Sequence, residues 1–305
     1  MAHPALERIL ALSSREEELK ATVAYLTQNL APAVKSGDAV LICFPHEQET
    51  DFGTMAGKAV KNCGGNPVFW GEDPRWKELL RLSFLWKATA IIAPPLIILG
   101  LTKLAAYKKV PLYLTHAVMA GYPCLNWFID GVERGLDCVT MGAFGPGITS
   151  MLSGFSCNCG RGIHLRDDRY MVKILDNEGR ALPDGSMGRI AIAHRDDPDA
   201  LYPTRNFARL LTEPCLCGNP SPKLVDLDVE HNSDFFMLEL AADLLYWNSI
   251  LDCSVERTEQ GVRVEIVCFP GEKMPKLPAC AKLVVRSWDP ERDCPLTLDP
   301  KWTAP

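Results

Sequence analysis

The chain has 305 residues, of which 47% are hydrophobic and 23% are charged, and its formal net charge is −6. This length predicts a large core and about two structural units, since a domain usually spans roughly 100 to 200 residues. The acidic balance argues against a general binder of nucleic acids or anionic membranes.

The N-terminal region offers no apolar signal-peptide core, because charged side chains occur from Glu7 to Lys20. The most apolar stretch, Ala88 to Leu101, is too short to span a bilayer and is interrupted by Pro94 and Pro95. We therefore expect a cytoplasmic protein with no membrane span, in which this stretch forms a buried strand and the start of a helix.

Helices and strands alternate through the first half of the chain. The apolar periodicity predicts helices over 14–34, 53–62, 76–86, 96–107 and 125–134, and strands over 39–44, 67–70, 88–92 and 111–119. Such alternation is typical of βαβ units and a mainly parallel sheet.

The pattern changes after Cys138. Residues 145–211 are rich in Gly, Pro and Asp, and we expect antiparallel structure with short strands over 170–175 and 188–193 joined by long loops. A last unit begins near Asn232. It is predicted to hold a helix over 235–247 and strands over 253–258, 262–269 and 281–287.

The predicted fold class is therefore α/β. We expect a largely parallel sheet with flanking helices, an antiparallel β-rich segment and a small α+β C-terminal subdomain. The expected first domain covers residues 1–231, with an αβ-layered region over 1–140 and a β-rich region over 141–231. The subdomain follows over residues 232–305.

The chain has twelve cysteines, which are not expected to form disulfides in a reducing compartment. Most are isolated in the sequence and are predicted to be small buried hydrophobes. Two pairs differ: Cys157 with Cys159, and Cys215 with Cys217. Together with His164 they supply four or five ligands from two loops about 50 residues apart, which suits a tetrahedral structural zinc site. The spacing leaves Cys157 and Cys159 both open, and free thiols with a surface histidine are the alternative.

Several other features carry less weight. His116 is interpreted as a core histidine, and His194 is placed in a polar loop. The tryptophans Trp70, Trp76 and Trp86 would mark an interface or, as the pattern favours, pack in the core. The segment from Gly53 to Lys58 resembles a phosphate loop only loosely, since no Ser or Thr follows the lysine.

The run from Gly145 to Gly218 resembles the adenylate-forming enzymes of the phenylacetate–CoA ligase branch. The resemblance rests on Gly145-Pro146-Gly147, on Cys157 seven residues before His164, on Asp168, on Tyr202-Pro203-Thr204-Arg205-Asn206 and on Pro214-Cys215-Leu216-Cys217-Gly218. Several members of that family bind structural zinc through the matching set. The resemblance thus implies zinc at Cys157, His164, Cys215 and Cys217, and it selects Cys157 over Cys159.

The resemblance also implies a nucleotide site and a small mobile C-terminal domain from Phe235 onward. The candidate nucleotide-binding residues are Gly121, Tyr202, Arg205 and Asn206. ATP or AMP, CoA and an aryl or acyl acid are the small molecules that such a fold would bind. A homo-oligomer, or a complex with a catalytic subunit, is the expected assembly.

Departures from the family pattern concern the chemistry. The sequence begins beyond the family's phosphate loop, and its magnesium-binding Thr and Glu fall on Met141 and Gly142. Its ribose-binding aspartate falls on Asn206, the hinge falls near Val229 and Glu230, and Lys301 is the only late candidate for the catalytic lysine. Because of these departures, we assign no catalytic residue. We expect a degenerate ligase-like binding protein, and an active ATP-dependent acyl- or aryl-CoA ligase is the alternative.

Overall fold

A computed structural model describes residues 15–49, 51–71, 73–121, 126–145, 153–157, 162–229, 240–241, 243–258, 261–271 and 281–296. Its helices are α2 (Arg15–Leu30), α3 (Phe52–Asn62), α4 (Trp76–Leu85), α5 (Pro95–Lys108) and α6 (Asn126–Gly135). Among the described residues no helix is both long enough and apolar enough to cross a membrane.

The first half of the large sheet is parallel, as predicted. Its strands are β1 (Ala39–Ile42), β2 (Asn66–Phe69), β3 (Ala90–Ala93), β4 (His116–Met119) and β5 (Val139–Phe144). They lie in the order β2-β1-β3-β4-β5, and each neighbouring pair is parallel. Both faces are covered, so the strands are apolar runs without alternation.

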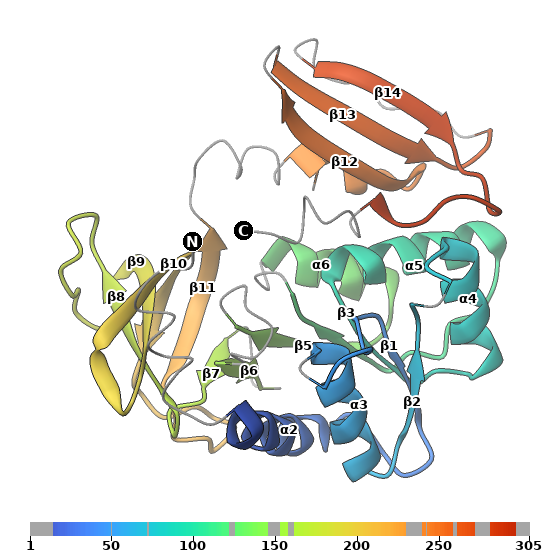
Figure 1. Ribbon diagram of the computed structural model, residues 1–305. Coiled ribbons are helices and arrows are strands. Elements are labelled where there is room, and N and C mark those ends of the chain that lie inside the picture. The colour runs from blue at the N-terminus through green and yellow to red at the C-terminus, as the bar shows by residue number, and fades with distance from the viewer. Residues whose placement is uncertain are drawn as a thin grey trace.

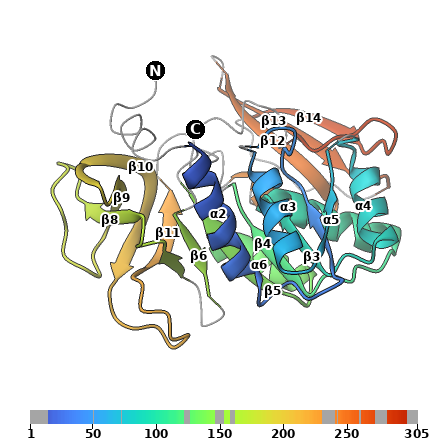
Figure 2. The same cartoon turned by 60° about the horizontal axis from the view of Figure 1, so that its bottom comes forward.

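Neighbouring residues of each parallel strand enter different cores. Leu41 and Ile91 pack against α4, α5 and α6, whereas Val40 and Ile92 pack against α2 and α3. The helices therefore form two layers on opposite faces of the sheet (Figures 1 and 2). The prediction of a helix-flanked parallel sheet is confirmed.

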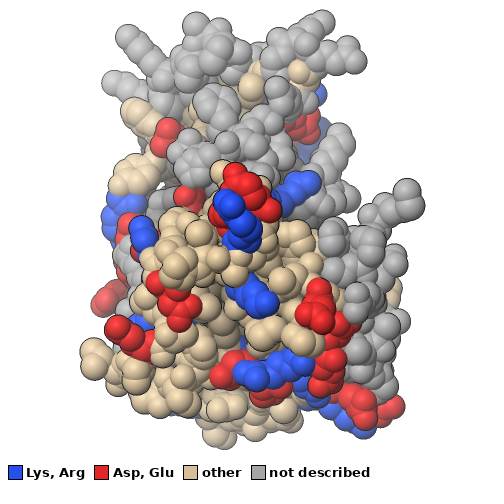
Figure 3. Space-filling view, turned by 90° about the vertical axis from the view of Figure 1, so that its left-hand side faces the viewer, with Lys and Arg blue, Asp and Glu red and all other residues tan. Residues whose placement is uncertain are grey.

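The second half of the same sheet is antiparallel. It contains β6 (Gly154–Ser156), β7 (Ile163–Leu165), β8 (Tyr170–Leu175), β9 (Met187–His194), β10 (Asp197–Leu211) and β11 (Lys223–Val229). The order continues as β5-β6-β7-β11-β10-β9-β8. Charged side chains of both signs are interspersed on this side of the molecule (Figure 3).

The prediction of long loops within 145–211 is wrong for residues 197–211, because these form β10, a strand of 15 residues. Its pairing with β9 shifts register between Asp197 and Tyr202 and again between Pro203 and Phe207. These irregularities break the alternation of apolar and polar residues by which a strand is recognised in sequence.

Three further strands form a separate sheet: β12 (Ile250–Thr258), β13 (Gly261–Cys268) and β14 (Ala281–Ser287). β12 and β13 are antiparallel, and β13 and β14 are parallel. This sheet lies above α4, α5 and α6 in Figure 1. The small C-terminal sheet was predicted, and residues 240–241 and 243–245 show a portion of the predicted helix.

The predictions for individual tryptophan and histidine positions are correct for some residues and wrong for others. Trp70 and Trp76 are core residues, at 2% and 1% exposure, whereas Trp86 is exposed. His194 does not lie in a polar loop, because it ends β9 and is buried beside Asp196, with 3.4 Å between Nδ1 and the Asp196 carboxylate. The segment from Gly53 to Lys58 lies inside α3 and forms no phosphate loop.

Candidate metal centre and adjoining cavity

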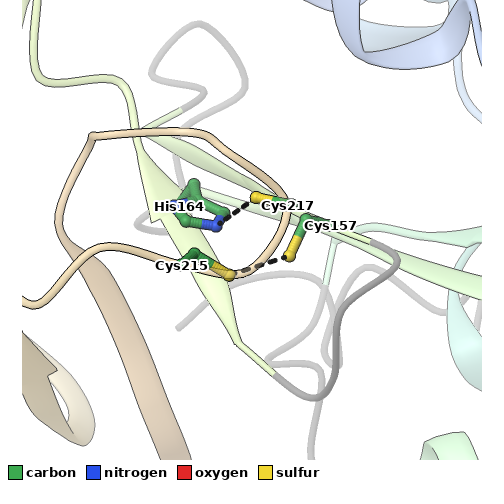
Figure 4. A group of neighbouring side chains, drawn as sticks. All are labelled: Cys157, His164, Cys215 and Cys217. Carbon is green, nitrogen blue, oxygen red and sulfur yellow. Dashed lines mark hydrogen bonds between the residues drawn. The ribbon is translucent and has the colours of Figure 1, made fainter.

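Four predicted ligands come together from three places in the antiparallel half. Cys157 directly follows β6, His164 is the middle residue of β7, and Cys215 and Cys217 lie in the turn between β10 and β11. Their ligand atoms all lie within 4.8 Å of one another (Figure 4). Cys159 lies outside the described residues.

The pairing of strands explains why such distant residues meet. β7 pairs with β6 on one side and with β11 on the other. The start of β11 therefore brings the preceding turn against His164. That turn is tight: the Gly218 amide donates to the Cys215 carbonyl at 3.0 Å, and Gly218 has a φ of +81°, which a glycine adopts without strain.

The interatomic distances fit a tetrahedral ion. The Cys157 and Cys215 sulfurs are 3.8 Å apart, and the Cys217 sulfur is 3.3 Å from His164 Nε2. A zinc tetrahedron with Zn–S bonds of about 2.3 Å has edges of roughly 3.8 Å between sulfurs. The donor set of three thiols and one imidazole is the one that zinc prefers in structural sites.

Hydrogen bonds around the cluster orient its ligands. His164 Nδ1 lies 2.9 Å from the Ser221 carbonyl oxygen and donates to it, which leaves Nε2 directed at the sulfurs. The Asn219 amide donates to the Cys217 sulfur at 3.4 Å. A hydrogen bond from the Cys217 amide is the main reason that the pKa of Cys215 is lowered to about 6. The cluster thus favours the thiolate that a metal requires.

A buried arginine supports the strand that carries His164. The Arg166 side chain is 1% exposed, and its Nη1 donates to Glu18 at 3.1 Å and to Thr22 at 3.2 Å, both on α2. The Tyr25 hydroxyl on the same helix donates to the His164 carbonyl at 3.5 Å. Helix α2 is therefore tied to the backbone of the metal centre.

A cavity of about 390 Å³ adjoins the cluster, between α6, β5, β7 and β11. Its apolar wall includes Met119, Ile129, Met141, Ile163 and Leu224. Glu133 and Asp226 also line it, and so does Cys157, which belongs to the metal cluster as well.

The predicted nucleotide-binding residues are not in this cavity lining. Tyr202, Arg205 and Asn206 lie on β10, and Gly121 follows β4 with a φ of +82°. The Asn206 amide donates to the Thr204 hydroxyl at 3.1 Å. By contrast, Met141 and Gly142 do line the cavity. Lys301 and Glu230 lie outside the described residues.

Only the comparison with solved structures finds proteins that are similar to this chain. No family model matches the sequence, and no curated protein matches it. Among solved structures, a 2-hydroxyisobutyryl-CoA ligase in the postadenylation state, in complex with R3-HIB-AMP, is similar with a TM-score of 0.66 and 12% identity. That match covers 88% of this chain and 66% of the other.

Two further structures agree. The anthranilate CoA ligase AuaEII in complex with anthranoyl-AMP has a TM-score of 0.56 at 12% identity, covering 88% of this chain and 59% of that one. A benzoate CoA ligase from Burkholderia xenovorans LB400 has a TM-score of 0.56 at 13% identity, covering 87% and 62%. The chain spans less than two thirds of the length of these ligases. The fold of this chain is similar to that of these CoA ligases over the part that the matches cover.

Proposed function

We propose that this chain is a zinc-containing, small-molecule-binding protein of the acid–CoA ligase fold that lacks standard ligase chemistry. The observation that carries this proposal is the identity of two residues in the cavity wall. Met141 and Gly142 stand where the resemblance places a magnesium-binding Thr and Glu, and Met141 is buried. A thioether and a glycine offer no oxygen ligand for magnesium from their side chains.

Adenylation depends on stabilising charge that develops on a phosphate, through a metal ion, lysine or loop donors. Among the described residues that line the cavity there is no lysine or arginine, and both charged ones are acids. The position of the ribose-binding aspartate is Asn206, which lacks the charge that strengthens such a hydrogen bond. These features together favour binding without turnover.

We assign zinc a structural role at Cys157, His164, Cys215 and Cys217. Four protein ligands complete a tetrahedron, so no coordination position is left for water or substrate. The ion would hold the turn between β10 and β11 against β7, beside the cavity. This proposal has three further elements. The first domain ends at residue 231, the chain belongs to the phenylacetate–CoA ligase branch, and the protein is cytoplasmic.

The second candidate is an active ATP-dependent acyl- or aryl-CoA ligase. The similarity in fold to a 2-hydroxyisobutyryl-CoA ligase and a benzoate CoA ligase favours it. ATP-dependent pyrophosphate exchange with benzoate and anthranilate separates the two functions. We expect no exchange above background. Exchange that disappears in Asn206→Ala would establish the ligase and overturn our proposal.

Binding is measured separately by calorimetric titration with AMP, CoA and benzoate. Saturable binding of one of these probes is expected, and failure of all three contradicts the binding function. Metal analysis of the purified protein should give about one zinc per chain, falling to background in Cys215→Ser/Cys217→Ser. Cys63→Ser is the matched control, since Cys63 lies outside the cluster on α3's C-terminal end. Unchanged zinc in the double variant would refute the assignment.

A further inference from the structure

The C-terminal sheet and the three helices beneath it share one hydrophobic core. Buried residues of α5 and α6, such as Leu104 and Phe128, belong to the same cluster as Leu244, Ile250 and Phe269. Interfaces between domains that move relative to one another are usually smaller and more polar than a domain core. A common core instead favours a fixed arrangement.

Aromatic rings interlock at the end of α5. The ring of Tyr107 stacks on that of Phe269 with centroids 4.3 Å apart and an interplanar angle of 10°. Trp288 packs edge-on against both rings, at 6.3 Å and 6.1 Å. The ammonium group of Lys108 lies 4.9 Å from the Trp288 ring centroid. Any sliding of the sheet along α5 would move Phe269 and Trp288 away from the Tyr107 ring and break these contacts.

Lys103 of α5 reaches into the C-terminal unit. Its ammonium group donates to the carbonyl oxygens of Leu245, Trp247 and Ile250, the last two at 3.2 Å and 2.9 Å. These carbonyls run from Leu245, the last of the helical residues 243–245, to Ile250, the first residue of β12. Burial lowers the pKa of Lys103 to about 8, as expected for an ammonium group removed from water. Movement of the sheet away from α5 would break these three hydrogen bonds.

The last described residues return to α4 and close the arrangement. The Trp76 amide donates to the Asp293 carbonyl at 3.1 Å, and Glu291 forms ion pairs with Lys77 and Arg75. On the opposite side of this segment, the Leu296 amide donates to the buried Asp252 carboxylate on β12 at 2.6 Å. The sheet is thus held at both ends, on α4 and on α5.

We infer that β12, β13 and β14 form a fixed outer layer of the body, anchored by Lys103, and are not a domain that rotates. This inference is independent of the zinc and of the ligand. It departs from the mobile C-terminal domain that the sequence resemblance implies. None of the described residues from 240 to 296 lines the cavity, so a fixed unit would not carry a side chain into it.

Hydrogen exchange measured by mass spectrometry on the whole wild-type chain tests this inference. If the layer is fixed, the slowest amides of β13 and of β3 should respond in parallel to added denaturant and exchange through the same opening. Calorimetry should show a single unfolding transition. Separate transitions, or β12–β14 amides that exchange through an independent opening at lower denaturant, would overturn the inference.

A variant tests the anchor itself. Lys103→Met keeps the aliphatic stem and removes the donor, and it should lower the melting temperature by roughly 4 °C or more. Exchange should become faster in both α5–α6 and β12–β13. Lys61→Met, on the exposed surface of α3, is the matched control and should change neither measurement. Faster exchange confined to β12–β14 would show that Lys103 does not join the layers. If Lys103→Met does not fold, the wild-type exchange decides alone.

Discussion

Replacing Arg166 by methionine should destabilise the chain strongly. The guanidinium is almost fully buried, and its partner Glu18 is 14% exposed. Removing one member of a buried ion pair leaves an uncompensated charge and typically costs about 3–5 kcal/mol. Glu18 would still accept a hydrogen bond from Tyr170 at 3.0 Å and would keep Arg169 at 3.7 Å. We therefore expect the lower end of that range, about 3 kcal/mol.

The assay is guanidinium unfolding followed by circular dichroism. Arg166→Met, Glu18→Gln and the double variant form a cycle, and the double variant should recover about 2 kcal/mol relative to the sum of the single changes. Arg180→Met is the control: Arg180 also pairs with an acid, Asp176, at 2.8 Å, but its side chain is 75% exposed. It should leave stability unchanged within error, because exposed pairs contribute little. A loss below about 0.5 kcal/mol for Arg166→Met, or a strictly additive cycle, would refute the reasoning.

Three further changes have defined outcomes. Gly100→Ala should destabilise by about 1–3 kcal/mol in thermal unfolding, despite alanine's helix propensity, because a Cβ there would overlap the buried Trp76 indole. In a Trp76→Phe background the same change should cost less. Burial raises the pKa of Asp252 to about 7, so the folded state binds the proton more tightly than the unfolded state, and stability should fall from pH 4 to pH 7. Asp252→Asn should flatten the pH dependence of the free energy of unfolding. An unchanged slope between pH 4 and pH 7 in this variant would contradict the assignment of the dependence to Asp252. Lys109→Gly should raise the melting temperature, because Lys109 ends α5 with a φ of 55°.

Much of the parallel half could be predicted because its signals are local. The apolar run at Ala39 predicts β1 within two residues, and the amphipathic segment ending at Asn62 predicts α3. Each such element satisfies its own periodicity, so no distant contact is needed to recognise it. The same is true of β8 and β14, whose predicted and observed ranges coincide.

The grouping of Cys157, His164, Cys215 and Cys217 was predicted for a different reason. Two thiols two residues apart before a glycine suit a tight turn around a metal, and the resemblance to the ligase family supplied the full set of four ligands. Spacing did not separate Cys157 from Cys159. The described structure places the Cys157 sulfur 3.8 Å from Cys215, a relation that depends on how β6 pairs with β7.

The lining of the cavity and the fixed C-terminal layer were not predictable, because each is built from contacts between distant segments. The cavity combines the end of β4, one side of α6 and portions of β5, β7 and β11. The anchor of this outer layer is Lys103, which in sequence is an ordinary polar residue of a largely apolar helix. Its buried position follows from the strand that packs on it, about 150 residues later, and no local pattern carries that information.

Cys157 links the two halves of the proposed function. It belongs to the metal cluster and to the cavity lining, and Ile163, which also lines the cavity, precedes His164. An ion that fixes Cys157 and His164 would therefore fix one wall of the cavity. Arg166, two residues after His164, holds the same strand against α2 from the other side. A rigid wall lowers the entropy lost when a ligand is bound, so under the proposed function a structural zinc ion would contribute to binding without taking part in chemistry.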